Sequence, residues 1–219
     1  MTVTLAIETS SINYGVALCT PREVVVCQTV RRDAPSFQGF GCLVWSALRA
    51  VGYEFQDVER LAVDVGPGNL GSVRTGVAYA NGLAFSLRRL IYCADSLTLL
   101  AAEVSESEPG EEHVLCLRNA GGGNVYAGLF RHGRALGMRR GPLGSVVTSL
   151  AGGLARVSVA GTFRKEVEDM LTNTLIRDTG IEFPNVSALH RLLVEKGSDT
   201  TGFVPVASPL NDSSSVFGE

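Results

Sequence analysis

Residues 61–84 read LAVDVGPGNLGSVRTGVAYANGLA and predict a strand, a sharp turn and a helix in immediate succession. The short β-rich run from Leu61 to Val65 favours a strand. Gly66-Pro67-Gly68 permits the unusual backbone angles of a tight turn, and Asn69 is a residue type that caps helix N-termini. We therefore expect a helix from Leu70 to Leu87.

The predicted helix has an unusual composition. Its one charged residue is Arg74, so it cannot expose its whole circumference to water. Small residues recur at every fourth position and therefore share one face, at Gly76, Ala80 and Ala84. Three interior glycines would each cost the helix about 1 kcal/mol relative to alanine, namely Gly71, Gly76 and Gly82. We expect the close approach of another element, from this chain or from a partner, to offset that cost.

The composition indicates a globular chain. Its 219 residues are 45% hydrophobic and 19% charged, enough for one domain or two small lobes with a core. The net charge of −3 argues against binding nucleic acid without a partner, and no apolar run is long enough to cross a membrane. Five cysteines without a Cys-x-x-Cys spacing favour reduced core thiols, and the N-terminus lacks the basic start of a signal peptide. We expect a cytoplasmic protein.

Apolar periodicity predicts an α/β chain of two lobes. In the first lobe, 1–104, we expect strands at 5–7, 16–19, 24–30, 61–65 and 90–93, and helices at 37–51, 70–87 and 97–104. The acidic stretch 105–112 is the expected linker. In the second lobe, 113–219, we expect strands at 113–118, 124–130, 134–138 and 156–160, and helices at 145–154, 162–175 and 186–196. Val167, Met170 and Leu171 should point inward from the helix at 162–175.

Few residues carry recognisable chemistry. The three histidines form no metal-binding pair by spacing, and the motifs of serine hydrolases and P-loops are absent from the sequence. Glu8-Thr9-Ser10, after the first strand, is either a seat for a phosphate or hydrated metal or an ordinary hydroxyl-rich turn. The turn at Gly66 and Gly68 is a second candidate anion seat, although it lacks a lysine. Arg74 could supply charge there, but pairing with Asp64 or with an acid of another chain is preferred.

Three segments of the sequence resemble the TsaB (YeaZ) family. They are Leu5–Ser10, Gly66–Gly76 and Ala80–Ala84, with a weaker match at Asn124-Val125-Tyr126. That family pairs with the TsaD (Kae1/Gcp) enzyme to make the threonylcarbamoyl modification on adenosine 37 of tRNA. Glu8 stands where the family typically has an aspartate, and residues 69–72 read Asn-Leu-Gly-Ser where it has Ser-Phe-Thr-Gly. The resemblance is therefore to a divergent member.

The resemblance implies an actin-like, Hsp70-like, sugar-kinase-like (ASKHA) fold of two RNase H-like lobes with mixed sheets, and a non-catalytic scaffold role. It implies that the helices at 37–51 and 70–87 form the face that pairs with a TsaD-like subunit, or with a second copy when the chain is alone. ATP or ADP and a metal would belong to that partner, a TsaE-like ATPase would join the complex, and tRNA would bind only through it. The residues expected at the face are Phe40, Val44, Trp45, Leu48, Leu70, Val73, Arg74, Val77, Ala80, Leu83, Ala84 and Leu87.

Three alternatives stand beside this interpretation. The chain could be an independent ATP-dependent enzyme of the same superfamily, with Glu8, Thr9, Ser10, Gly66 and Gly68 around a phosphate. A peptidase is disfavoured, because no base and nucleophile can be paired from these residues. For Trp45, the alternative to a place on the face is packing under a loop.

Overall fold

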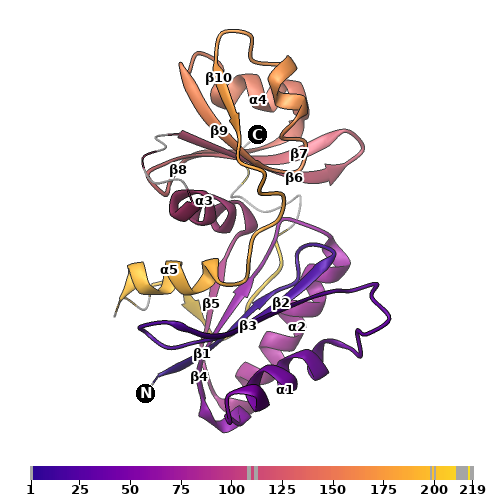
Figure 1. The fold of residues 1–219 in the computed structure, drawn as a ribbon, viewed down its shortest axis with the longest axis vertical. Helices are drawn as coiled ribbons and strands as arrows, with labels where there is room; N and C mark the ends of the chain where they lie inside the picture. Colours follow the sequence, from indigo (N-terminus) through magenta and orange to yellow (C-terminus); the bar gives the residue numbers. More distant parts are fainter. Residues whose placement is uncertain are drawn as a thin grey trace. The chain divides into compact units, whose positions relative to one another are not determined.

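The computed structural model describes residues 2–107, 110, 113–197, 199, 201–210 and 217. The chain forms two compact units, Met1–Asp95 with Asn185–Pro209 and Ser96–Pro184 with Leu210–Glu219, and each is described by itself (Figure 1). This division differs from the predicted lobes, because the helix at Ser96 belongs to the second unit and the chain returns to the first at Asn185. Of the predicted linker, residues 105–107 end that helix, whereas 108, 109, 111 and 112 lie outside the described residues.

A six-stranded mixed sheet forms the first unit, in the order β11-β5-β4-β1-β2-β3. β1, β2 and β3 make an antiparallel meander, β4 pairs parallel with β1, and β5 pairs parallel with β4. Its strands are β1 (Val3–Glu8), β2 (Asn13–Cys19), β3 (Val24–Arg31), β4 (Val58–Asp64), β5 (Ile91–Ala94) and β11 (Phe203–Val204). The central strand β1 is buried along its whole length, so its alternate side chains pack on the two faces of the sheet.

Helices α1 (Phe40–Ala50) and α2 (Leu70–Leu87) cover one face of this sheet. A Cβ added to Gly76 of α2 would collide with Thr9 Oγ1 and would lie 3.3 Å from Ile7 Cγ2. The glycine therefore lets α2 approach the end of β1, and at this position the expected close contact is made within the chain. Phe40 packs edge-on against Tyr79, with ring centroids 5.1 Å apart, so α1 and α2 are neighbours. A short helix, η1 (Phe55–Asp57), joins α1 to β4.

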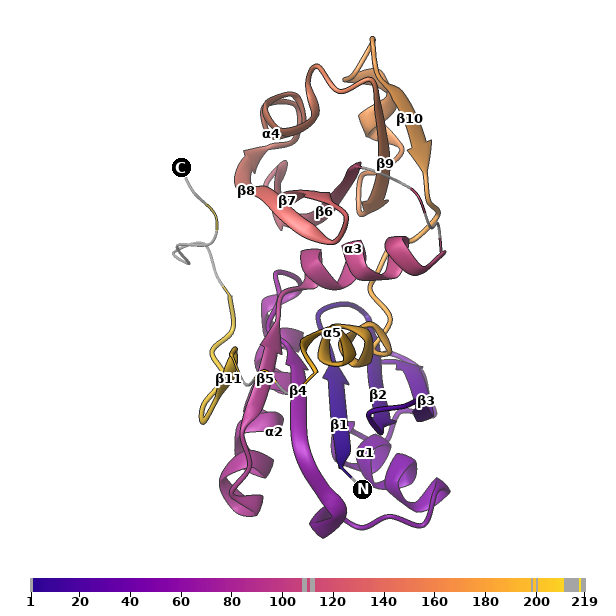
Figure 2. The ribbon, with the colours of Figure 1, turned by 90° about the vertical axis from the view of Figure 1, so that its left-hand side faces the viewer.

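The segment that returns from the second unit covers the other face and one edge of the first sheet. A Cβ on Gly15 would lie 2.9 Å from Val186 Cβ and 3.7 Å from Glu8 Cβ, so Val186 lies on the face opposite α2. Helix α5 (Ala188–Lys196) follows, and Lys196 Nζ donates a hydrogen bond of 2.9 Å to the Thr201 carbonyl. β11 then pairs with β5 and covers that edge of the sheet (Figure 2).

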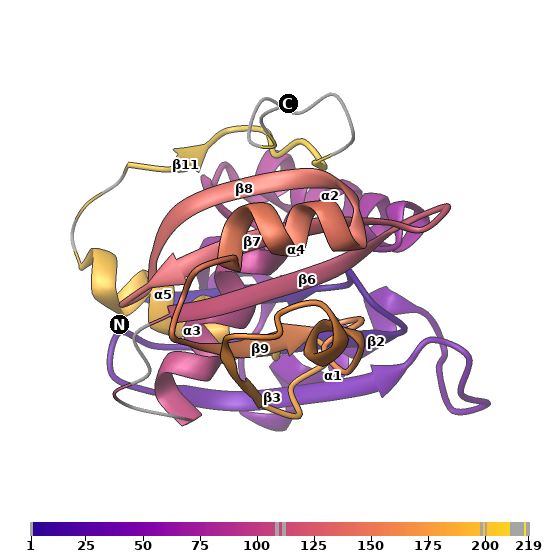
Figure 3. The same ribbon diagram turned by 90° about the horizontal axis from the view of Figure 1, so that it is seen from above.

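The second unit is built on a five-stranded sheet in the order β10-β9-β6-β7-β8. Along β6, Val114 and Cys116 pack on the side of helix α3, whereas Leu115 and Leu117 pack on the side of helix α4. Figure 3 shows α4 lying across the sheet. The elements are α3 (Ser96–Ser107), β6 (His113–Gly121), β7 (Asn124–Arg131), β8 (Arg134–Pro142), α4 (Leu143–Ala151), β9 (Arg156–Gly161), η2 (Glu166–Asp169) and β10 (Leu175–Asp178).

The two sheets repeat one topology. In each, an antiparallel meander of three strands is followed by two strands that run parallel to the first, giving the order third-second-first-fourth-fifth. β11 is an addition to the first sheet only. Two mixed sheets of the same topology, with helices on their faces, confirm the predicted fold class.

One predicted element is wrong. Instead of a helix over 162–175, the structure has the single 3₁₀ turn η2 and then the unpredicted strand β10. Phe163 has a φ of 64°, in the left-handed region that a right-handed helix cannot include. The prediction for the apolar side chains is confirmed, since Val167 and Leu171 are buried in the core beside α4 and Met170 packs against them.

Candidate interaction surface

The structure divides the residues predicted for the dimer face into a buried and an exposed group. Seven of them have at most 6% of their surface exposed and point toward the sheet: Phe40, Val44, Leu48, Val73, Val77, Ala80 and Ala84. They hold α1 and α2 on the sheet and offer almost no surface to a partner protein. For these seven residues the predicted place on the face is corrected to a place in the core.

The exposed group is smaller and includes Arg74, the one charged residue among those predicted. Trp45 is 53% exposed, Leu70 is 41% exposed and Arg74 is exposed, whereas Leu83 and Leu87 are half-buried. The sequence prediction omits Phe85, which is 90% exposed on α2. The sequence contains a signal for the exposure of Phe85. The small and apolar residues at 73, 77, 80 and 84 recur with helical spacing and share the side that faces the sheet, which leaves Phe85 on the opposite side of the helix.

The surface of α2 that faces away from the sheet carries four small residues and then the large apolar Phe85. We call it the α2 outer face; its residues are all exposed and spaced by three or four: Gly71, Thr75, Ala78, Gly82 and Phe85. A Cβ on Gly82 would meet no described atom within 4 Å, so packing within the described chain does not explain this glycine.

On the side of α2 that faces α1, the contact is close. A Cβ on Gly41 of α1 would lie 3.7 Å from Tyr79 Cε2 of α2. Burial, with a smaller effect of nearby Cys42, raises the pKa of Tyr79 above its ordinary value.

Asn81, next to this face, anchors the C-terminal segment. Its side-chain Nδ2 donates to the Ala207 carbonyl at 3.0 Å, and its Oδ1 accepts from the Ala207 backbone N–H at 2.8 Å. Ala207 is buried, whereas its neighbour Val206 is 65% exposed. Part of the Ala80–Ala84 segment therefore serves to hold the chain's own backbone, which no local pattern indicated.

The hydroxyl-rich turn after β1 uses its polar groups internally. Thr9 Oγ1 donates to the Ser72 carbonyl at 2.8 Å, while the Ser10 backbone N–H and hydroxyl both donate to Glu8 Oε1 at 2.6 Å. All these groups are buried. The arrangement favours the structural interpretation of Glu8-Thr9-Ser10 over the phosphate seat, which stays a prediction.

The turn before α2 is also bonded within the chain. Gly66 N–H donates to Asp64 Oδ1 at 2.8 Å, and Asn69 N–H donates to the Ser10 carbonyl at 2.9 Å. Asn69 Oδ1 accepts from the Ser72 N–H at 3.1 Å, which confirms the predicted cap. Gly66 has a φ of 91°, which requires glycine, and Gly68 is half-buried.

Arg74 is exposed and forms no ion pair with any residue that the structure describes. The predicted pairing with Asp64 is therefore wrong, since that buried carboxylate accepts from the backbone of the turn instead. Pairing with an acid of another chain stays a prediction.

The described residues contain no group of three or more His, Cys, Asp or Glu side chains that could hold a metal. Within the same part of the chain, no helix combines the length and the apolar character that a membrane span needs. The thiols of the buried Cys19 and the half-buried Cys93 are poor nucleophiles, because burial raises the pKa of Cys19 to about 12, with a smaller effect of Cys27, and that of Cys93 to about 11.

Comparison with known proteins finds relatives of this chain in sequence and in fold. The family model described as TsaD, tRNA N6-adenosine threonylcarbamoyltransferase, matches residues 40–140. The tRNA threonylcarbamoyladenosine biosynthesis protein TsaB of Bacillus subtilis (strain 168) is 29% identical over 209 residues, which cover 94% of this chain and 81% of that protein. YeaZ from Pseudomonas aeruginosa superposes with a TM-score of 0.81 at 25% identity, over 96% of this chain and 100% of that chain. In sequence and in fold the chain is similar to TsaB and YeaZ.

The threonylcarbamoyltransferases match this chain over only part of their own length. The tRNA N6-adenosine threonylcarbamoyltransferase of Clostridium perfringens (strain SM101 / Type A) is 22% identical over 167 residues, which are 76% of this chain and 43% of that enzyme. The chain thus spans less than half the length of this curated relative. The resemblance to TsaB (YeaZ) found in the sequence is confirmed, and α1 and α2 both lie within the segment matched by the family model.

Proposed function

We propose that this chain is a member of the TsaB/YeaZ family and acts in the biosynthesis of tRNA threonylcarbamoyladenosine as a non-catalytic accessory subunit. Similarity to the threonylcarbamoyladenosine biosynthesis protein TsaB of Bacillus subtilis supports the pathway, and the match to the family model of the transferase supports a TsaD-like partner. In this proposal the chain is a scaffold that pairs with the transferase. It forms a homodimer when the partner is absent.

The observation that carries the proposal is the α2 outer face. Phe85 is 90% exposed there, and Trp45 on the neighbouring helix is 53% exposed. Groups of exposed large apolar side chains mark protein interfaces, and we assign Phe85 and Trp45 to one such group. Gly71 and Gly82 leave room for a second helix to approach α2 closely, so this face, with Trp45, Leu70 and the unpaired Arg74, receives helices of the partner.

The division of labour within the complex follows from the same proposal. ATP or ADP and a metal are held by the TsaD-like subunit, and a TsaE-like ATPase and tRNA join only the complex. The internal hydrogen bonds of Glu8, Thr9 and Ser10 support this assignment, because the donors that an isolated nucleotide site would need are already used. Hydrolysis of ATP by the isolated chain would instead favour the independent enzyme.

The test is complex formation with a TsaD-like subunit from the same organism, followed by gel filtration and a tRNA threonylcarbamoylation assay. We expect Phe85→Glu to abolish co-elution and modification while its circular dichroism stays that of the wild type, since a charge would be buried unpaired at the interface. Leu136→Glu is the matched control, because Leu136 is 57% exposed in the second unit. Wild-type chain that forms no complex, or Phe85→Glu that binds normally, would contradict the proposal.

Ala80→Glu separates the core from the surface. Ala80 is fully buried against the sheet, so this variant should fail to fold rather than fold without binding. A folded Ala80→Glu protein that had lost only its partner would return the interface to the small-residue face of α2.

A further inference from the structure

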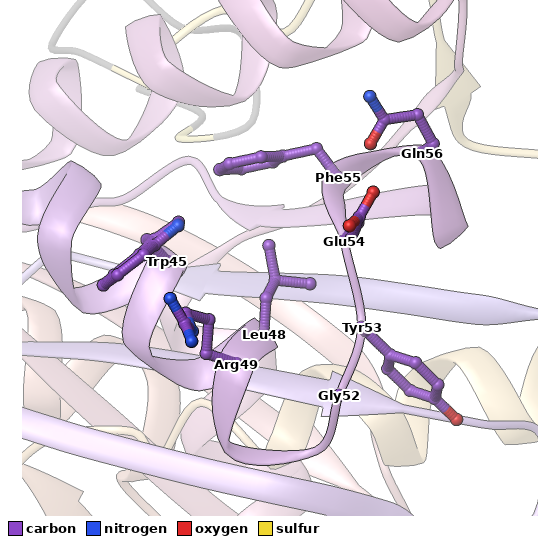
Figure 4. A pocket seen from close by; sticks show the side chains of 8 residues that line it. All are labelled: Trp45, Leu48, Arg49, Gly52, Tyr53, Glu54, Phe55 and Gln56. Carbon is purple, nitrogen blue, oxygen red and sulfur yellow. The ribbon is translucent and has the colours of Figure 1, made fainter.

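A hollow of about 540 Å³ lies beside the C-terminal half of α1 (Figure 4). One continuous segment, residues 45–56, builds it from the end of α1, the turn that follows and the start of η1. The volume lies within the range of small-molecule sites in proteins. Because the lining comes from consecutive residues of the first unit, the hollow needs no other element to complete it.

Aromatic and aliphatic side chains form its walls and floor. Leu48, which is 1% exposed, lies at the base, the 53% exposed ring of Trp45 lies to one side of it, and the half-buried ring of Phe55 lies above it (Figure 4). Two aromatic rings around an aliphatic base provide stacking and edge contacts for a flat apolar group. The walls therefore select for a planar ring.

One cation is held in place at the rim. The guanidinium carbon of Arg49 lies 4.8 Å from the centroid of the Trp45 ring, so stacking fixes the charged group beside the hollow. None of the described carboxylates pairs with it. The nearest acid in the lining, Glu54, lies on the Phe55 side and caps η1 together with Asp57, whose Oδ2 accepts from the Glu54 N–H at 2.8 Å. The Arg49 side of the hollow thus offers a donor to an anion.

We propose that this hollow binds a small aromatic anion, a molecule with one planar ring and a carboxylate on a short chain. The ring would lie over Leu48 between Trp45 and Phe55, and the carboxylate would accept hydrogen bonds from Arg49. A neutral aromatic molecule would leave the guanidinium without an acceptor, and an aliphatic anion would forgo the contacts of the two rings. The proposal concerns the chain without its partner, because Trp45 also belongs to the face proposed to receive that partner.

Trp45 makes the test direct, because it is the one tryptophan of the chain and its indole N–H gives a single NMR signal. Isotope-labelled full-length chain is titrated with 3-phenylpropionate, with the uncharged 3-phenylpropionamide and with the ring-free hexanoate. We expect a saturable shift of the indole signal with 3-phenylpropionate. The amide and hexanoate should each bind at least about tenfold more weakly, as expected for the loss of one charge-assisted contact or one ring.

Two variants assign the charge. Arg49→Gln should lower the affinity for 3-phenylpropionate to that for the amide, and Arg22→Gln, at an exposed arginine of the β2–β3 turn, should leave it unchanged. Equal affinities of the wild type for acid and amide, or no saturable shift, would overturn the proposal without recourse to any variant. An unchanged affinity in folded Arg49→Gln would also overturn it.

Discussion

Substitution of Gly76 by alanine tests the contact between α2 and the end of β1. The added methyl group would collide with Thr9 Oγ1 and would lie 3.2 Å from Thr9 Cγ2 and 3.3 Å from Ile7 Cγ2. Thr9 and Ile7 are both fully buried. The Thr9 hydroxyl also donates to the Ser72 carbonyl at 2.8 Å, so it cannot turn away without losing a buried hydrogen bond.

These contacts set the magnitude. Overpacking of a core costs about 1–3 kcal/mol, and loss of the hydrogen bond costs about 1 kcal/mol. The higher helix propensity of alanine returns about 1 kcal/mol. We therefore expect Gly76→Ala to lower the free energy of unfolding by about 1–3 kcal/mol. Urea denaturation followed by the fluorescence of Trp45 measures this quantity in the first unit.

Gly82→Ala is the matched control on the same helix. Its new methyl group would meet no described atom within 4 Å, so this variant should gain about 0.5–1 kcal/mol. In a Thr9→Ala background the colliding atoms are gone, and Gly76→Ala should cost less by more than about 0.5 kcal/mol. Equal effects of Gly76→Ala and Gly82→Ala would refute the described packing of α2.

Four further predictions concern residues of the first unit. Asn81→Ala removes both hydrogen bonds to the Ala207 backbone, so the Ala207 amide should exchange its hydrogen faster, by a factor that corresponds to about 1–2 kcal/mol. Asn69→Ala removes the cap of α2 and should lower the free energy of unfolding by about 1 kcal/mol, whereas Asn69→Asp should retain it. At pH 8 the exposed Cys42 should react with a thiol reagent before Cys19 does. Burial raises the pKa of the Cys19 thiol in the folded chain to about 12, whereas in the unfolded chain the thiol ionises near its ordinary pKa of 9.0. The stability that this group contributes is therefore complete below about pH 9 and is lost as the pH rises to 12, and Cys19→Ala should flatten this dependence in denaturation curves.

Local signals in the sequence were sufficient for the boundaries of α2. The helix spans Leu70–Leu87 as predicted, and Asn69 caps it through its side chain. Caps and turn residues act on their immediate neighbours, which is why they can be identified without tertiary information. The sequence did not predict which side of α2 faces the sheet, because a helix with a single charged residue has no polar side that marks the solvent-exposed surface. Gly76 and Ala80 are small because β1 lies close, and a partner helix would require the same residue types.

Contacts between distant parts of the chain were beyond such signals. Asn81 and Ala207 are 126 positions apart, and no periodic pattern in the sequence predicts their hydrogen bonds. The same holds for the strand β11. In the second half of the chain, the helix predicted over 162–175 is wrong, because Val167 and Leu171 have helical spacing but reach the core from a turn. The hollow at Trp45 depends on the path of residues 52–56 after α1, which composition does not predict.

The division of the first unit between Met1–Asp95 and Asn185–Pro209 has a consequence for synthesis on the ribosome. The early part of the nascent chain carries β1 to β5, but the edge of β5 can be covered only after β11 has been translated. During that interval an open sheet edge is available to other nascent chains and to chaperones. A premature stop codon shortly before Asn185 would therefore damage the N-terminal half of the molecule, although every residue of its α1 and α2 would have been made.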